Sequence, residues 1–409
     1  MKEKSLSGSD ESVSTPLWEC VPLTDYHVPT LPVDKVAARL WSSIRQMYRR
    51  KDAVGIELKK EQELHALPQV RLAHLVPSLP WQDAAAVLDT TLQDWLESSM
   101  SNNSVKFFIG QPFSAHAEIV SLFGRQHGAV EITPPSMEQI LSRDESWLDH
   151  WPSPETFWVL PKMEHCYLRH ANGLDLMRRL MSLAANGQLG KGLIGCDSWA
   201  WAYVQRIFPW PLAPAITLQA FDAERLQRLL VGLMKTQTKK ALHCHSAKNG
   251  QVITSDASEG EQPPKEFAEL AAHCRGNVAI ATTYWRERLR HHSDKDEASE
   301  HENPQKDTDE SESVEQVWIA EMPSDPGLPL GKDEEFFLLL HAMLLHDGLP
   351  ESLLGELLPF SSARCLGLLS QLQQSRIALC INGRWQVCDM AYATVRRLLS
   401  ARDYLTDSF

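Results

Sequence analysis

The residues that could do chemistry gather directly after a short apolar stretch, Val105–Gly110. From Gly110 onward the spacing fits the pattern GxxxxGK(S/T). In that pattern glycines let the backbone wrap phosphates, the lysine meets the β- and γ-phosphates, and the hydroxyl binds Mg²⁺. Here Ala115, His116 and Ala117 stand in place of the second glycine, the lysine and the hydroxyl residue. The stretch therefore has the spacing of a phosphate-binding loop without its chemical groups.

Each of the three replacements removes something that a working loop needs. Ala115 adds a Cβ at a point where glycine permits close approach or positive φ. His116 is shorter than lysine and mostly neutral at pH 7, and Ala117 has no oxygen for a metal. We therefore expect no ATP hydrolysis. Binding of ATP stays open, because the N–H groups at a helix start can hold phosphate without a lysine.

A second apolar segment, residues 156–160, shows the same kind of loss. A strand at this place normally ends in an acid that orders Mg²⁺, but Pro161 and Lys162 follow here. Glu164 comes two residues later, and its position favours a solvated side chain at the start of a helix. The acid that would order the metal is therefore missing from the expected position.

These residues need a sheet that brings them together. Five short apolar segments separated by helical patterns predict βαβ units and a mostly parallel sheet. The expected strands are residues 105–110, 129–132, 156–160, 192–196 and 215–219. The expected helices in and around them are residues 33–48, 82–97, 119–127, 137–141, 174–185, 226–242 and 264–290. Asp197 follows the fourth strand, where it serves either as a group that senses the nucleotide or as an ordinary strand-end turn.

Composition divides the chain into five regions. We expect a disordered leader at 1–15, a mostly helical region at 16–104, an α/β domain at 105–290 with a mobile insertion at 246–262, an acidic linker at 291–332, and a compact last unit at 333–409. Between His291 and Val317, ten acids outnumber Lys295 and Lys306, and this run contributes −8 of the net charge of −13. Such a run is typical of a solvated linker; the alternative is a docking tail for a basic partner.

The last unit has helical patterns at 334–346, 351–358 and 361–374, then a hairpin at 377–388 and a helix at 390–404. Asn382 and Gly383 form the turn of this hairpin, because both residues tolerate positive φ. Three helices followed by a hairpin predict a winged-helix domain. Arg364 on the third helix and Arg384 on the hairpin would face DNA, but so few basic groups give little affinity for phosphates. A protein partner is therefore favoured over nucleic acid.

The loop at 110–117, the strand at 157–160, residues 194–197 and the closing helix at 270–289 together resemble the STAND/AAA+ branch of P-loop ATPases. The resemblance covers roughly residues 105–290 and extends to the terminal winged helix that such proteins often carry. It implies a P-loop NTPase-like parallel sheet with flanking helices, and an ATP-dependent switch or oligomer. The departures at Ala115, His116, Ala117, Pro161 and Lys162 fall on the chemical positions.

We therefore predict a catalytically inactive ATPase-like scaffold or regulatory subunit that acts through protein contacts, as a homo- or hetero-oligomer, without a cofactor. Two alternatives remain: an unconventional ATP-binding ATPase of the same branch, and a winged-helix DNA-binding regulator. Gel retardation by the winged helix would favour the second, and micromolar ATP binding the first.

The remaining features predict a soluble cytoplasmic protein. The polar, serine-rich start has no apolar stretch typical of a secretory signal, and the longest apolar run, 336–345, is about half of a membrane span. None of the eight cysteines sits in a CxxC pattern, so we expect reduced thiols. His243, Cys244 and His245 are the nearest approach to metal ligands, but neighbouring residues point in different directions, and we expect no metal site.

Overall fold

The computed structural model describes residues 16–29, 64–98, 104–210, 213–237, 242–248, 250, 252–253, 263–292, 315–324, 326–327 and 334–409. The expected leader at 1–15, the helix at 33–48 and most of the insertion and linker lie outside these residues. Among the helices of the described part, none combines the length and the apolar character needed to cross a membrane.

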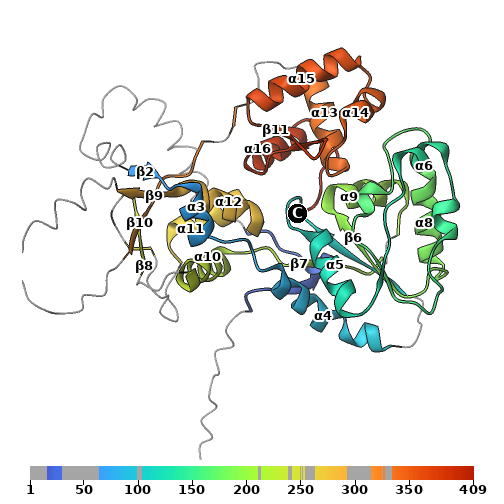
Figure 1. Ribbon diagram of the computed structural model, residues 1–409, viewed down its shortest axis with the longest axis horizontal. Coiled ribbons are helices and arrows are strands. Elements are labelled where there is room, and N and C mark those ends of the chain that lie inside the picture. The colour runs from blue at the N-terminus through green and yellow to red at the C-terminus, as the bar shows by residue number, and fades with distance from the viewer. Residues whose placement is uncertain are drawn as a thin grey trace, which may run out of the picture.

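A six-stranded sheet with the order β1-β7-β3-β6-β5-β4 lies at the centre of the α/β domain (Figure 1). Its strands are β1 (Cys20–Pro22), β3 (Val105–Gly110), β4 (Val130–Glu131), β5 (Trp158–Leu160), β6 (Gly192–Asp197) and β7 (Ala215–Leu218). Strands β3 to β7 pair in parallel, and β1 adds an antiparallel edge beside β7. The predicted, mostly parallel sheet with flanking helices is confirmed, and it is consistent with a P-loop NTPase-like fold.

Helices cover both faces of this sheet because side chains alternate along its central strands. Phe108 of β3 packs into one core with α5 (His116–Gln126) and α4 (Trp81–Glu97). Its neighbours Phe107 and Ile109 pack into a second core with α8 (Asp175–Ala185) and α9 (Ser198–Ile207). Two shorter helices, α6 (Met137–Ser142) and α7 (Ser146–Asp149), lie between β4 and β5 in the chain. The sheet is therefore held from both sides, and its strand ends carry the site.

A second, four-stranded sheet with the order β2-β9-β10-β8 lies to one side (Figure 1). It comprises β2 (Leu64–Ala66), β8 (Leu242–Ser246), β9 (Leu289–His292) and β10 (Glu315–Ile319). The helices α3 (Gln69–Leu75), α10 (Ala223–Gln237), α11 (Lys265–His273) and α12 (Val278–Arg288) belong to the same part of the molecule. This second sheet was not predicted from the sequence.

Three expectations change in this region. The helix expected at 226–242 ends at Gln237, and the one expected at 264–290 is two helices, because Arg275 and Gly276 take φ values of 53° and 72°. Part of the range expected to be linker is strand β10, in which Val317 and Ile319 are buried. The neighbouring acids concealed the alternation of these two apolar residues.

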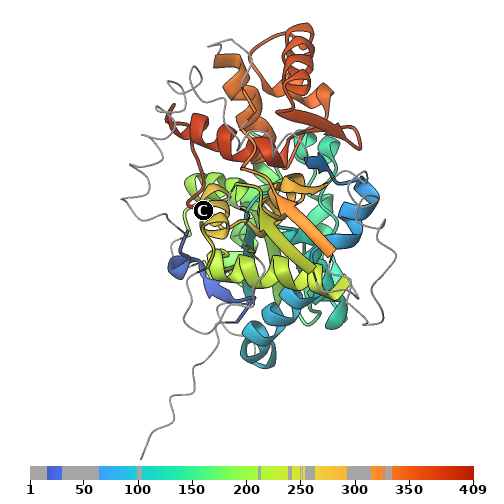
Figure 2. The same ribbon diagram turned by 90° about the vertical axis from the view of Figure 1, so that its left-hand side faces the viewer.

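The C-terminal unit contains four helices and a hairpin. They are α13 (Glu334–Leu345), α14 (Glu351–Leu357), α15 (Ser362–Gln374), β11 (Ala378–Ile381), β12 (Arg384–Val387) and α16 (Asp389–Ser400). Asn382 and Gly383 have φ values of 50° and 78°, so the structure has the predicted turn. Figures 1 and 2 show this unit stacked on the rest of the molecule.

Candidate functional site

The ends of three parallel strands bring the predicted site residues together. Gly110 at the end of β3 is in register with Asp197 at the end of β6, and β5 ends beside β6. β3 lies between β6 and β7, so the crossover connections on its two sides diverge here. Open α/β sheets bind ligands at such a point, outside the carboxyl ends of the strands.

The loop at 110–117 keeps the backbone shape that its spacing predicts. Ala115 has φ 53° and ψ 30°, which is the left-handed region, and it caps the start of α5. A Cβ on Gly110 would lie 2.5 Å from both the His116 Cβ and the Ser114 Oγ, so this position needs glycine. Ala115 thus has a positive φ, a conformation that glycine adopts without strain.

His116 points inward to Glu164. Its Nε2 lies 3.0 Å from the Glu164 Oε1, and the Asp197 backbone N–H donates to Oε2 at 3.1 Å. Glu164 is 0% exposed. The interpretation of Glu164 as a solvated residue is therefore wrong. The short turn η2 (Met163–His165) after β5 folds Glu164 under the loop, where a charged group must find partners.

The two acids of this cluster differ in charge state. Burial alone would raise the pKa of Glu164, but the charge and hydrogen bond of His116 hold it below its ordinary value. Burial and the charge of Glu164 raise the pKa of Asp197 well above its ordinary range. Asp197 also caps α9, since its Oδ1 accepts the Trp199 N–H at 2.8 Å. Asp197 was expected either to sense the nucleotide or to form an ordinary strand-end turn. In the structure it lies in the turn after β6 and caps α9.

The positions where an acid would order Mg²⁺ carry other contacts. The Lys162 ammonium lies 2.8 Å from the Asp347 carboxylate, in the turn between α13 and α14. Pro161 turns its carbonyl toward Gly195, where a Cβ would lie 2.4 Å from that oxygen. Ala117 is the second residue of α5 and brings no oxygen. Lys162 thus joins the α/β domain to the C-terminal unit.

The two arginines predicted for the winged-helix surface are already engaged. Arg384 is half-buried, and its Nη2 donates to the carbonyl of Gly348 at 2.5 Å and to the Nε2 of His165 at 3.2 Å. It therefore faces the α/β domain and is not an open group on the surface of the C-terminal unit. Arg364 is exposed, but its Nε lies 2.6 Å from Glu335.

Glu164, His165 and Asp347 bring ligand-type atoms within 4.8 Å of one another. Lys162 and Arg384 supply positive charge at the same place, so we assign no metal to it.

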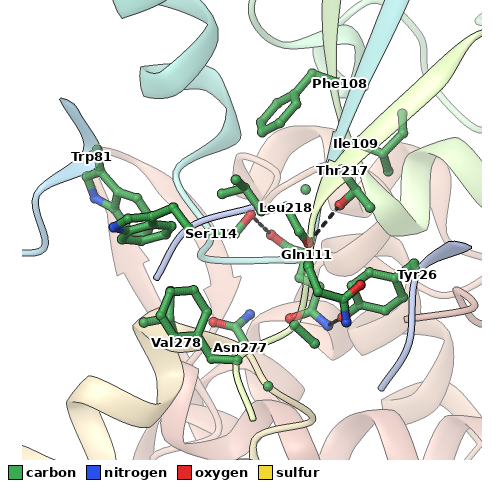
Figure 3. A pocket seen from close by; sticks show the side chains of 16 residues that line it. Tyr26, Trp81, Phe108, Ile109, Gln111, Ser114, Thr217, Leu218, Asn277 and Val278 are labelled. Carbon is green, nitrogen blue, oxygen red and sulfur yellow. Dashed lines mark hydrogen bonds between the residues drawn. The ribbon is translucent and has the colours of Figure 1, made fainter. Parts of the chain in front are cut away.

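A small pocket lies beside the loop (Figure 3). Gln111 and Ser114 line it from the loop, and Trp18, Tyr26 and Trp81 line it from the N-terminal part. The Gln111 amide donates to the Tyr26 hydroxyl at 2.7 Å. The volume of this pocket is about 30 Å³, which is enough space for about two water molecules. A second cavity of about 80 Å³ lies on the other side of the loop, between Pro112, Phe113 and Asp197 and the C-terminal unit.

Two of the residues that hold the loop gave no signal in the sequence. Tyr26 contacts Gln111 from 85 positions away, and the Asn277 amide donates to the Pro112 carbonyl at 2.8 Å from 165 positions away. Neither residue lies in a motif. The loop is therefore supported by partners that only the folded chain brings near.

No protein-family model matches the chain, and no curated protein matches it. Among solved structures it is similar to a Walker-type ATPase of Pyrococcus abyssi, with a TM-score of 0.25 and 11% identity, over 76% of this chain and 95% of that chain. A similarity of this size carries no argument. Functional conclusions therefore rest on the geometry of the site.

We expect Ala115→Gly to raise the free energy of unfolding by up to about 1 kcal/mol, because an L-residue in the left-handed region is strained and glycine is not. Urea denaturation measures the change. The matched control is Ala117→Gly inside α5, which should lower stability by about 0.5–1 kcal/mol. A loss of stability in both variants would contradict the strain at Ala115.

Because its pKa in the folded state is lowered, ionised Glu164 stabilises the fold above about pH 4.3, and this contribution disappears as the pH falls through the lower folded pKa. We expect Glu164→Gln to lower the free energy of unfolding at pH 7 by about 3 kcal/mol, since it leaves His116 without its partner. It should also flatten the fall in stability between about pH 5 and pH 2. Denaturation at several pH values tests both effects.

The control for this measurement is Glu118→Gln, on the exposed side of α5. It should leave stability within about 0.5 kcal/mol of the wild type. Equal effects of the two substitutions would mean that the buried pair contributes nothing special.

Proposed function

We propose that this protein is a catalytically inactive, ATPase-like scaffold or regulatory subunit that acts through protein contacts. The buried pair of His116 and Glu164 carries the proposal. In a working loop the lysine at this position faces the phosphates, whereas here the imidazole contacts an internal carboxylate at 3.0 Å. A phosphate at the start of α5 would meet an ionised Glu164 behind His116 instead of a free cation, and the two negative charges would repel.

The missing metal ligands support the same conclusion. Mg²⁺ requires oxygen ligands in near-octahedral geometry. Ala117 and Pro161 offer no side-chain oxygen, and Lys162 is a cation paired with Asp347. Of the two acids at the strand ends, Glu164 is paired with His116, and the raised pKa of Asp197 favours its neutral form. The arrangement therefore lacks the means to hold Mg²⁺ between the loop and β5.

The space beside the loop also disfavours a nucleotide. The Trp18 ring lies 4.9 Å from the Phe221 ring and 5.7 Å from the Trp81 ring, and Trp18 is buried. The two cavities beside the loop have volumes of about 30 and 80 Å³, whereas ligand pockets typically have volumes of about 300 Å³ or more. Nucleotide binding would require these rings to move.

The order of three helices and a hairpin in the C-terminal unit supports a winged-helix domain in a regulatory role. Arg364 pairs with Glu335 and Arg384 contacts the α/β domain, so neither is free to neutralise DNA phosphates.

For a catalytically inactive protein, we expect no phosphate release from Mg·ATP above that of a His116→Glu variant, and no micromolar ATP binding in a calorimetric titration. Gly110→Ala and Gly232→Ala form the matched pair, because a Cβ at Gly110 collides with the loop and one at Gly232 meets nothing within 4 Å. If the wild type binds or hydrolyses ATP, and Gly110→Ala abolishes this while Gly232→Ala does not, the protein is an unconventional ATPase instead.

A scaffold should hold its protein partner regardless of nucleotide. We therefore expect proteins captured from native cells to stay bound after ATP is removed enzymatically and Mg²⁺ is chelated, as quantified by mass spectrometry. In parallel, duplex DNA should not be retained by the full chain in a gel shift at physiological salt. Retention of DNA that Arg364→Ala weakens would favour the winged-helix DNA regulator.

A further inference from the structure

Residues 405–409 return from the C-terminal unit to the α/β domain. After α16 ends at Ser400, the His341 Nε2 of α13 donates to the Leu405 carbonyl at 3.0 Å. The following residues then run between the two parts of the molecule, where Figures 1 and 2 place the end of the trace. We call residues 405–409 the strap.

Asp407 fixes the middle of the strap. Its carboxylate is fully buried and accepts from the Arg396 Nε of α16 at 2.9 Å and from the Ser198 hydroxyl of α9 at 2.5 Å. The Arg396 Nη2 also donates to the Asp407 carbonyl at 2.9 Å. One carboxylate therefore joins a helix of the C-terminal unit to a helix that starts at the end of β6.

Phe409 continues the contact toward the loop. It is 2% exposed, its ring lies 4.5 Å from the Tyr26 ring, and its carbonyl accepts from the Arg275 Nε at 2.8 Å. The Tyr26 hydroxyl in turn accepts from the Gln111 amide. The strap therefore reaches the loop through one aromatic contact and one hydrogen bond.

The loop needs such support. Phe113 and Ala115 have φ values of 68° and 53°, conformations that persist only where the surroundings hold them. In a working phosphate loop the bound nucleotide supplies many of these contacts. Here Gln111 is held by Tyr26, which in turn packs on Phe409.

We propose that the strap holds the C-terminal unit on the α/β domain and orders the loop at 110–117 without a nucleotide. This goes beyond the proposed function and does not depend on it, because the strap can order the loop whether or not ATP binds. The strap is a fixed intramolecular contact. Asp407 joins the two units, and Phe409 packs against Tyr26.

The test compares Asp407→Asn and Phe409→Ala with Ser408→Ala, a control at an exposed position of the same strap. Hydrogen exchange of the full chain at pH 7 gives the readout. The Ser114 amide, which donates to the Gln111 carbonyl, reports on the loop, and amides of β3 and β6 report on the sheet. We expect the Ser114 amide to exchange about tenfold faster or more in the two test variants, because each variant loses a buried contact that supports the loop. The exchange rates of the β3 and β6 amides should not change.

Two results would overturn the proposal. Exchange at Ser114 equal to that of Ser408→Ala would show that the strap does not order the loop. Equal acceleration at Ser114 and in β3 and β6 would show only a loss of global stability. A third variant, Tyr26→Phe, keeps the ring on Phe409 and removes the hydroxyl that holds Gln111. It should accelerate Ser114 and leave the amides of α16 unchanged, and no effect at Ser114 would exclude the route through Tyr26.

Discussion

A fully buried carboxylate has to be paired, and the site of this protein is arranged around the pairing of Glu164. One of its oxygens contacts the His116 imidazole at the start of α5, and the other accepts a hydrogen bond from the Asp197 backbone N–H at the end of β6. The ends of three strands are thereby fixed against the loop. The same pairing keeps Glu164 ionised while Asp197 tends to the neutral form, because two acids this close in a dry environment cannot both carry charge easily.

The charge cluster extends from Glu164 into the contact with the C-terminal unit. Lys162, from the same turn, pairs with Asp347, and Arg384 reaches back to His165 and Gly348. His165 accepts this hydrogen bond as a neutral imidazole, and burial lowers its pKa to about 4. Positions that would handle Mg²⁺ in an ATPase thus take part in holding two units together.

The inactive-scaffold proposal and the strap proposal both concern the loop at 110–117. The first rests on the pairing of His116, and the second on the contacts that order the loop. His116 is paired with an internal carboxylate, which is the observation behind the proposal that the loop does not bind phosphate. The contacts of Asn277 with Pro112 and of Tyr26 with Gln111 supply order that a ligand would otherwise bring. A loop that is held permanently by its own chain is useful as a fixed surface, which is what a scaffold requires of it.

The sequence by itself determined the features that depend on near neighbours. Short apolar runs predicted β3 and β6, the 3.6-residue period predicted α5 and α8, and Asn382 with Gly383 predicted the hairpin turn, because each signal lies within a few residues. The spacing from Gly110 also located the loop and the glycine-like position of Ala115. Only the tertiary structure decided the roles of Glu164, Arg384 and the strap. Glu164 lies 48 positions from His116, Arg384 lies 219 positions from His165, and Asp407 of the strap lies 209 positions from Ser198. Whether a charged side chain is buried or solvated depends on which residues the fold places against it.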